Sequence, residues 1–313
     1  MILAPKAAWR PVHGVLLLDK PVGLSSQDAL WRARRLLQAE KGGHTGTLDP
    51  LASGLLPLCF GAATKFAQAS LEADKGYLAT VQLGVTRVGG DLEGEVIEQR
   101  PVEADAAALE AALARLRGEI DQVPPMHSAL KHQGRALYEY ARAGIEVERA
   151  PRRVCIHRLA LLERRADELV LDVRCSKGTY VRTLAEDLGR LLGCGAHLSA
   201  LRRTASGELR VEQALTLDDL EALDPAARLA RMLPPDVLLR AWPEVRLPED
   251  EAGRFLTGLR RRVALADRAA VRVYGPQPRA FLGSAHIHAG ELIADRLLSP
   301  PEVQALVAGQ SAP

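Results

Sequence analysis

The apolar residues of this 313-residue chain occur in short runs, and this distribution is the strongest constraint on its fold. A run such as Val15-Leu16-Leu17-Leu18 is far shorter than the roughly 20 residues that a membrane-spanning helix needs. Hydrophobic residues still make up 47% of the chain and charged residues 26%, a balance typical of globular proteins with a buried core. The sequence therefore excludes a membrane bundle, a collagen-like repeat and a disordered chain.

Cysteine and histidine usage favours a reducing compartment without bound metal. The four cysteines are widely separated and form no C-x-x-C pair: Cys59, Cys155, Cys175 and Cys194. Three of the histidines, His44, His127 and His132, lack a metal-ligand spacing. Residues 1–10 contain no sustained apolar stretch before a small-residue cleavage site. We therefore expect a cytoplasmic protein with reduced thiols and no metal.

The charge of the chain says little about its partners. The formal net charge is +2, and only seven of the 41 basic residues are lysines. The planar fork of arginine suits phosphate. A GC-rich genome explains the same arginine bias together with the many alanines, and we favour that explanation.

The hydrophobic periodicity indicates a mixed fold. Buried strands are predicted over 14–19, 77–83 and 169–175, where apolar residues are continuous or alternate. A helix is predicted to begin at Ser25, and further helical patterns occur around 109–116 and 184–191. Strands and helices do not alternate regularly, so we predict an α+β fold with an antiparallel or mixed sheet.

A change in composition divides the chain in two. The stretch 233–250 is proline-bearing and acidic, as linkers often are, and short β-rich runs follow at 270–274 and 279–283. We therefore predict a first domain over 10–245 and a small, β-rich domain over 246–313.

A glycine-rich stretch, 42–54, is the densest candidate for chemistry. Its glycines permit a close backbone approach to a ligand, and Pro50 biases Asp49 toward an extended conformation on a loop. Local chemistry alone favours an aspartate that closes a turn. No Walker lysine and no G-x-G-x-x-G motif is present, so nucleotide binding is not supported.

Two further clusters lie at junctions between strands and helices. Residues 175–184 combine glycine, hydroxyls and Arg182, which could face a buried carboxylate or simply cover a turn. Lys20 lies at the end of a predicted strand, and Tyr77 opens another. Each feature taken alone has an ordinary structural explanation.

Taken together, the ordered blocks resemble the bacterial tRNA pseudouridine synthase B (TruB) family. The resemblance covers roughly residues 12–215, and several blocks at compatible spacing are far more specific than one motif. The matching blocks are 14–21, 43–54, 63–66, 74–77, 124–131, 137–142, 175–182 and 193–198.

The resemblance implies a catalytic domain of the pseudouridine synthase type that needs no cofactor and no metal. Asp49 corresponds to the catalytic aspartate of the family, and Arg182 to the arginine that pairs with it. The supporting residues are Tyr77, which packs against the base, Leu201, which lines the pocket, and Tyr180 and Lys20. This reverses the local preference for a structural Asp49.

The resemblance also implies tRNA as the partner. The enzyme would flip a uridine of the T-loop (position 55 in tRNA numbering) out of its stack. His44 corresponds to a histidine near the flipped base, and the segment at about 124–152 to an RNA-gripping insertion. Residues 246–313 resemble a PUA-type RNA-binding module. Candidate contacts to backbone phosphate are Arg142, Arg152, Arg153, Arg202 and Arg203.

One stretch departs from the family pattern. After Leu83-Gly84 the family usually carries a Thr-Asp-Thr run, whereas this chain has Arg87-Val88-Gly89, with Asp91 retained further on. Because the stretch lies outside the nucleophile block, we expect activity to persist and local loop structure or substrate handling to differ.

Three other functions compete with this one. An RNA-binding protein or tRNA-folding chaperone, in which catalysis is secondary, is the main alternative. A guide-RNA-dependent synthase is disfavoured by the block at 137–142 and the lack of a long basic tail, and a glycosidase by the lack of a second acid near Asp49. We expect a monomer that uses no guide RNA and does not bind membranes.

Overall fold

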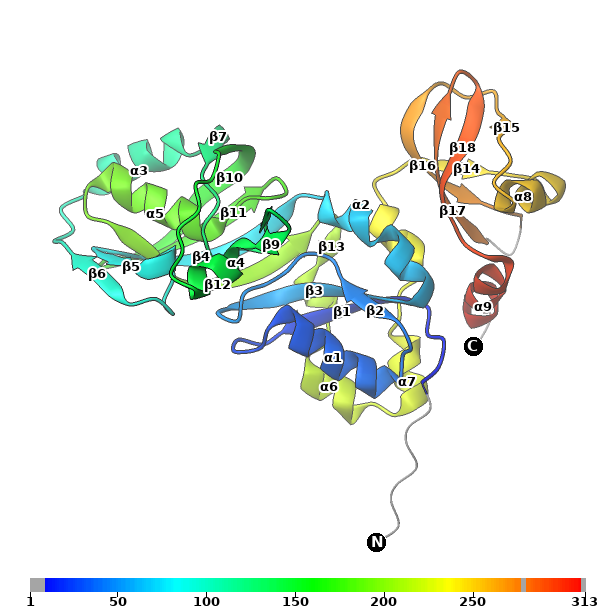
Figure 1. The fold of residues 1–313 in the computed structure, drawn as a ribbon, viewed down its shortest axis with the longest axis horizontal. Helices are drawn as coiled ribbons and strands as arrows, with labels where there is room; N and C mark the ends of the chain where they lie inside the picture. The colour runs from blue at the N-terminus through cyan, green and yellow to red at the C-terminus, as the bar shows by residue number, and fades with distance from the viewer. Residues whose placement is uncertain (1–8, 277–279, 311–313) are drawn as a thin grey trace, which may run out of the picture.

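The computed structural model describes residues 9–276 and 280–310. The chain forms a large α+β unit followed by a smaller β unit, which carries the C-terminal helix (Figure 1). This arrangement confirms the predicted fold class.

One nine-stranded sheet forms the frame of the large unit. Its central order is β1-β3-β12-β4-β11-β10-β7, with β2 added to β3 and β13 to β12. The pairs within it are antiparallel except for β3 with β12, so the sheet is mixed. The strands are β1 Gly14–Lys20, β2 Gly42–His44, β3 Ala52–Phe60, β4 Lys75–Leu83, β7 Gly118–Gln122, β10 Arg152–Arg165, β11 Glu168–Cys175, β12 Ala196–Ser206 and β13 Leu209–Arg210.

Helices cover the sheet in two groups. Packing against β1–β3 involves α1 and α6, and packing against β4, β10 and β11 involves α3 and α5. The helices of the large unit are α1 Ser26–Leu37, α2 Ala67–Leu71, α3 Ala106–Arg115, α4 Leu137–Arg142, α5 Val181–Leu192, α6 Leu217–Ala222 and α7 Pro225–Ala230. Short 3-10 turns are η1 Gly61–Phe66, η2 Val88–Gly90, η3 Val211–Gln213 and η4 Pro235–Leu239.

The local sequence signals explain where α1 begins and ends. The Ser25 side chain caps the helix by accepting a hydrogen bond from the backbone N–H of Asp28. At the other end Gln38 adopts the left-handed conformation that terminates many helices. The predicted start at Ser25 therefore corresponds to the N-cap of α1.

Two side chains lie at the junction of the two core clusters. Tyr77 of β4 and Leu201 of β12 each pack against both the β1–β3 cluster and the β4–β11 cluster. Gly54 makes this junction possible, because a Cβ there would lie 2.3 Å from the carbonyl oxygen of Arg203. Its φ of +100° is also one that glycine favours.

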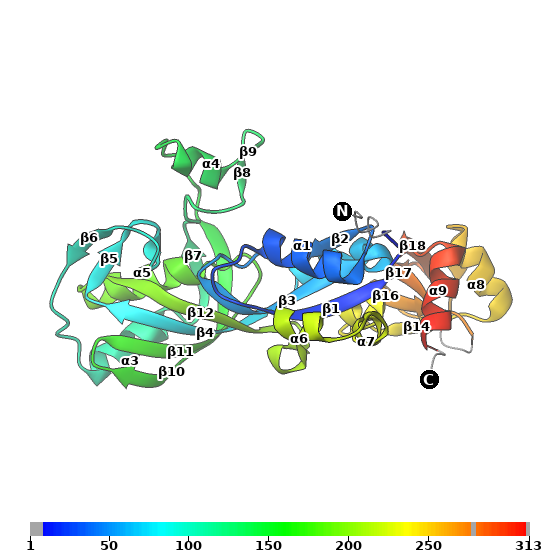
Figure 2. The same cartoon turned by 90° about the horizontal axis from the view of Figure 1, so that it is seen from below.

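A thin insertion projects from the large unit. It contains the hairpin β8 Lys131–His132 and β9 Arg135–Ala136, followed by α4. Figure 2 shows it standing away from the sheet, on the side on which α1 and β2 lie. A second small ribbon, β5 Val85–Arg87 with β6 Val96–Gln99, flanks the sheet.

The small unit is a five-stranded sheet of order β14-β16-β17-β18-β15. Because β14 belongs to it, this sheet begins before residue 246, where we placed the boundary. Arg279, the first residue of one predicted strand, lies outside the described residues. The elements are β14 Glu244–Arg246, α8 Glu249–Leu256, β15 Arg261–Arg262, β16 Arg268–Tyr274, β17 Phe281–His288, β18 Glu291–Leu297 and α9 Pro300–Gln310.

The segment between the units is packed rather than free. Leu239 of η4 lies in a cluster with Phe66 of the large unit and Phe281 of the small one. Lys65 adds an ion pair with Glu302 at 2.6 Å. The proline-bearing stretch that resembles a linker is thus partly an interface.

Candidate active site

A cavity of about 550 Å³ opens where the loop before β3 faces the insertion. Four separate parts of the chain line it. They are the loop with Thr47, Asp49 and Pro50; the stretch from Val88 to Glu95; His127, Ser128 and Ala129 with Tyr138 and Arg142 of the insertion; and Arg182 at the start of α5.

The loop that carries Asp49 is held at several points. Leu48 is buried, and its backbone exchanges two hydrogen bonds with the hydroxyl of Ser26, at 2.7 and 2.9 Å. The Pro50 carbonyl accepts a hydrogen bond from the backbone of Gly23. The Asp49 carbonyl closes a turn with Ala52, while its side chain remains 43% exposed toward the cavity. The backbone of Asp49 is therefore structural, and its carboxylate is available.

Arg182 connects this carboxylate to the opposite wall. Its side chain is only 7% exposed, and Nη2 lies 3.1 Å from Oδ2 of Asp49. The same nitrogen donates to the carbonyl of His127 at 2.7 Å. The other terminal nitrogen lies 3.4 Å from Oδ2 of Asp91. The pairing predicted between Arg182 and Asp49 is present, and Arg182 has a second acidic partner.

Asp91 is a site residue that our sequence analysis left outside the nucleophile block. Its side chain is 10% exposed, and the carbonyl of Gly89 accepts a further hydrogen bond from Arg182. The stretch from Arg87 to Gly89 is therefore not remote from Asp49, because η2 places it against Arg182. The sequence feature that could have identified Asp91 as a site residue was its position directly after the pair Gly89-Gly90.

Behind the aspartate loop lies a buried cation. The Arg203 side chain is 1% exposed and donates to the backbone carbonyls of Leu55 at 2.6 Å and Gly46 at 3.1 Å. We predicted that Arg203 contacts RNA phosphate, and this is wrong for the structure. Alternation along β12 turns Arg203 into the core, where main-chain oxygens surround its guanidinium.

Burial changes the titration of the groups around Arg203. Burial raises the pKa of Tyr77, and the nearby Arg203 guanidinium opposes the rise. Lys20 is fully buried and donates to the carbonyls of Pro21 and Leu24. Desolvation lowers the pKa of Lys20 to about 8, although the Asp49 carboxylate acts in the opposite direction.

The other two predicted supporting residues are Tyr180 and Leu201. Tyr180 is the N-cap of α5, and its backbone is fixed by two hydrogen bonds with the Gln122 amide. Burial raises the pKa of its phenol, and both Arg182 and Asp49 act on it electrostatically. Leu201 lies opposite Ala52, near the end of the aspartate loop.

The proposed RNA contacts have different surroundings. Arg142 lines the cavity and stacks over Tyr138, whereas His44 sits in β2 with a buried Nδ1 that has no partner among the described residues. Burial lowers the pKa of His44. Arg152 is exposed at the start of β10. Two others are paired with acids: Arg153 with Glu119 at 3.4 Å, and Arg202 with Asp19 at 2.6 and 2.9 Å.

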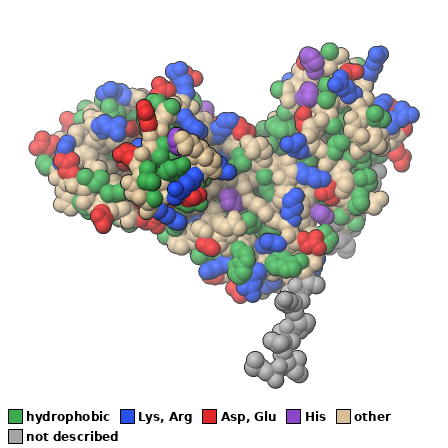
Figure 3. Space-filling model, in the orientation of Figure 1, with side chains coloured by type: hydrophobic (Ala, Val, Ile, Leu, Met, Phe, Trp, Pro, Cys, Tyr) green, Lys and Arg blue, Asp and Glu red, His purple; other side chains and the backbone are tan. Residues whose placement is uncertain are grey.

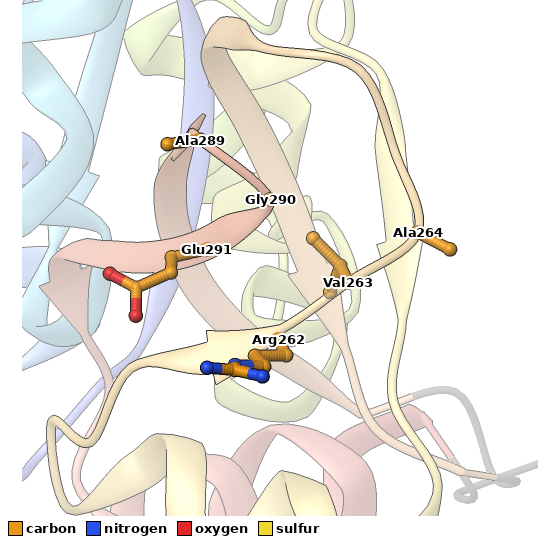
Figure 4. A pocket seen from close by; sticks show the side chains of 6 residues that line it. All are labelled: Arg262, Val263, Ala264, Ala289, Gly290 and Glu291. Atoms are coloured by element: carbon orange, nitrogen blue, oxygen red, sulfur yellow. The ribbon is translucent and has the colours of Figure 1, made fainter.

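A second hollow lies in the small unit. Figure 4 shows its walls, residues 262–264 and 289–291, with Arg262 and Glu291 as its charged side chains. None of the predicted site residues lines it. Among residues 9–276 and 280–310, no three His, Cys, Asp or Glu side chains are grouped to hold a metal ion. No helix in the same part of the chain is long and apolar enough to cross a membrane.

The fold matches solved structures of low sequence identity. A crystal structure of a Cbf5-Nop10-Gar1 complex gives a TM-score of 0.73 over 96% of this chain and 92% of that chain, at 23% identity. A structure of an H/ACA RNP bound to a substrate RNA containing 2'-deoxyuridine gives 0.70 over 97% and 95%, at 22% identity. These similarities show the fold alone.

Family models cover most of the chain. Residues 34–181 match the TruB family pseudouridylate synthase (N terminal domain). Residues 182–239 match the tRNA pseudouridylate synthase B C-terminal domain, and 243–298 match pseudouridine synthase II TruB, C-terminal. Fold and family models together define a pseudouridine synthase with a PUA-like C-terminal domain.

Curated relatives narrow this class. The tRNA pseudouridine synthase B of Cupriavidus pinatubonensis is 56% identical over 306 residues, covering 94% of this chain and 96% of its own. That of Burkholderia lata is 58% identical over 300 residues, covering 94% and 92%. The chain belongs to the tRNA pseudouridine synthase B (TruB) family and is a tRNA pseudouridine synthase, an isomerase.

Proposed function

We propose that this enzyme converts one uridine of the tRNA T-loop, position 55 in tRNA numbering, to pseudouridine, acting as a monomer without guide RNA. The observation that carries the proposal is the position of the Asp49 carboxylate. It lies on a loop that is fixed by hydrogen bonds, and it is exposed to the cavity beside buried Arg182. The family membership supports the reaction class.

The cavity suits a nucleotide that leaves its stack. Its volume of about 550 Å³ lies within the range typical of small-ligand sites, roughly 300–1,000 Å³. An enzyme that acts on a stacked base must extrude it. His44 and the arginines of the insertion and its base are our candidates for holding the displaced loop: Arg142, Arg152 and Arg153. For Arg202, contact with phosphate requires that it share or leave its pair with Asp19.

The reaction rearranges one glycosidic bond. The C1′–N1 bond breaks, the uracil turns, C5 bonds to C1′, and the proton from C5 is lost while N1 gains one. The Asp49 carboxylate acts as a nucleophile on ribose or base, or as a base on the sugar. Each route requires an oriented anion, and Arg182 orients it. Tyr77 and Leu201 pack against the uracil, and Tyr77 handles a proton.

A tritium-release assay tests this proposal. A T-loop transcript labelled at C5 of uridine is incubated with wild type, Asp49→Asn and Asp172→Asn, without added metal or cofactor. Asp172 is the control, since it lies in β11 outside the cavity and pairs with Arg158. We expect release by wild type and by the control, and a loss of about 10⁴-fold or more in Asp49→Asn. RNA binding and the unfolding midpoint of Asp49→Asn should stay near wild type, because the amide keeps the shape.

The outcomes separate the two functions under consideration. Wild-type release by Asp49→Asn would disprove the assigned mechanism. If wild type and both variants bind the transcript but none of them releases tritium, the tRNA-folding chaperone is favoured. Release from a transcript whose only label lies outside the T-loop would disprove the assigned position.

A further inference from the structure

The exposed face of α1 carries an unusual arrangement of aromatic and basic side chains. The Trp31 ring is 51% exposed and lies 4.7 Å from the guanidinium carbon of Arg35. The Trp9 ring is 47% exposed and lies 4.6 Å from that of Arg34. On or beside α1, two large aromatic rings are thus exposed, and each lies against a guanidinium group.

Several cations on this face are uncompensated. The side chains of Arg32, Arg35 and Lys41 are exposed and make no ion pair or hydrogen bond with any residue that the structure describes. By contrast, Arg34 is occupied, because it donates to the carbonyls of Ala39 and Glu40. We call Trp9, Trp31, Arg32, Arg35 and Lys41 the α1 face.

The acids beside the α1 face offset only part of its positive charge and form no ion pair with it among the described residues. Asp28 accepts a hydrogen bond from the Ser25 hydroxyl at the start of α1. Glu40 is exposed beside Lys41 but forms no ion pair within the described ranges. Arg35 lies over the Trp31 ring, and its N–H groups make no hydrogen bond with a described residue, so they are available to phosphate oxygens.

The α1 face is tied to the catalytic loop. The first residue of α1, Ser26, holds Leu48 next to Asp49. A 12-residue helix is about 18 Å long, so Arg35 lies about 14 Å along the axis from Ser26. In Figure 2 the insertion projects on the same side as α1, and Figure 3 shows Lys and Arg side chains in blue around hydrophobic groups in green over α1.

We propose that the α1 face binds the sugar–phosphate backbone of the RNA stem next to the target loop. The inference rests on the proposed function. An RNA backbone fits better than a protein partner because the three unpaired cations, Arg32, Arg35 and Lys41, outnumber the two nearby acids, Asp28 and Glu40, and the face begins at the catalytic loop.

Two RNA hairpins with the same T-loop test the proposal. One has a stem of two base pairs and the other of seven, and each is labelled at C5 of the target uridine. The enzymes are wild type, R32Q/R35Q, Trp31→Leu and R115Q. Arg115 is the control, because it is an exposed arginine at the end of α3, which packs in the other core cluster.

We expect R32Q/R35Q to raise KM for the long hairpin about tenfold and to leave kcat unchanged, since phosphate contacts supply affinity. The slope of log(kcat/KM) against log[salt] should become shallower by about 2, one for each lost contact. Trp31→Leu should raise the same KM about twofold to fivefold, the size of an exposed cation–π contact. Neither change should alter KM for the short hairpin.

The outcomes distinguish this proposal from the function on which it rests. Unchanged KM and salt slope for R32Q/R35Q on the long hairpin would overturn it and leave the α1 face to a protein partner. An equal rise with R115Q would also overturn it, since any lost positive charge would then suffice. Absence of product from both hairpins with wild-type enzyme would instead refute the proposed function.

Discussion

A buried arginine lies on each side of the loop that carries Asp49, but the two arginines have different partners. On the cavity side, Arg182 lies between two carboxylates, those of Asp49 and Asp91. On the core side, Arg203 has no carboxylate partner within the described residues and is held by main-chain carbonyls. Burial lowers the pKa of Arg203, which is the cost of this environment.

The difference shows that the partner, and not the residue type, determines what a buried cation does. Carboxylates give Arg182 a charge to orient, and both carboxylate residues, Asp49 and Asp91, line the cavity. The carbonyl partners of Arg203 accept its hydrogen bonds but carry no net charge. Arg203 therefore stabilises the fold around the loop and does not orient a carboxylate. We therefore expect changes on the cavity side to affect turnover most and changes on the core side to affect stability most.

After the loss expected for Asp49→Asn, the largest effect on turnover is expected from Arg182→Met. It leaves Asp49 without its orienting partner, and we expect kcat to fall about 10²–10³-fold, as when one preorganised electrostatic partner is removed. Single-turnover tritium release measures this loss. If Arg203→Met lowers turnover as much as Arg182→Met does, after correction for the folded fraction, the two arginines do not differ in their effect on turnover.

The largest effect on stability is expected from Arg203→Met. The carbonyls of Leu55 and Gly46 would lose their donors inside the core, at about 1–3 kcal/mol each. Removing the desolvated charge offsets part of this, so we expect the free energy of unfolding to fall by about 2–4 kcal/mol. Urea denaturation measures it, and a wild-type midpoint would contradict this stabilising role.

The core-side lysine makes stability depend on pH. The pKa of Lys20 is about 8 in the folded chain and 10.5 when unperturbed. Between these values the unfolded chain binds more protons than the folded one, so stability contributed by this group rises with pH. Relative to Lys20→Met, wild type should gain up to roughly 3 kcal/mol between pH 8 and 10.5. A difference that stays flat across this window would show that Lys20 titrates normally.

The smallest effect is expected from Asp91→Asn. The amide keeps its shape, and Arg182 retains Asp49, so only one of its two ionic partners is lost. We expect kcat to fall about tenfold, a change of about 1.4 kcal/mol. If turnover equals that of wild type, only the Asp49–Arg182 pair on the cavity side contributes to turnover, and Asp91 does not.

Local sequence signals were sufficient for the secondary structure near the site. The predicted strand at 169–175 is β11, because its apolar residues alternate, and the predicted helix start at Ser25 is the N-cap of α1. Asp49 illustrates the limit of such signals. Local chemistry favoured a turn residue, and the structure contains that turn, while only the assembled blocks pointed to the carboxylate.

What the sequence determined by itself was the class of the protein and the main pair of its site. The blocks around Asp49 and Arg182 carry both, since their residue types and order are written along the chain. Neighbours on β12, Arg202 and Arg203, must point to opposite faces of the strand. Which of them enters the core depends on the sheet, since the carbonyls of Leu55 and Gly46 come from other parts of the chain. The tertiary structure likewise brought Asp91 to Arg182, because a contact across that sequence distance depends on how η2 packs against α5.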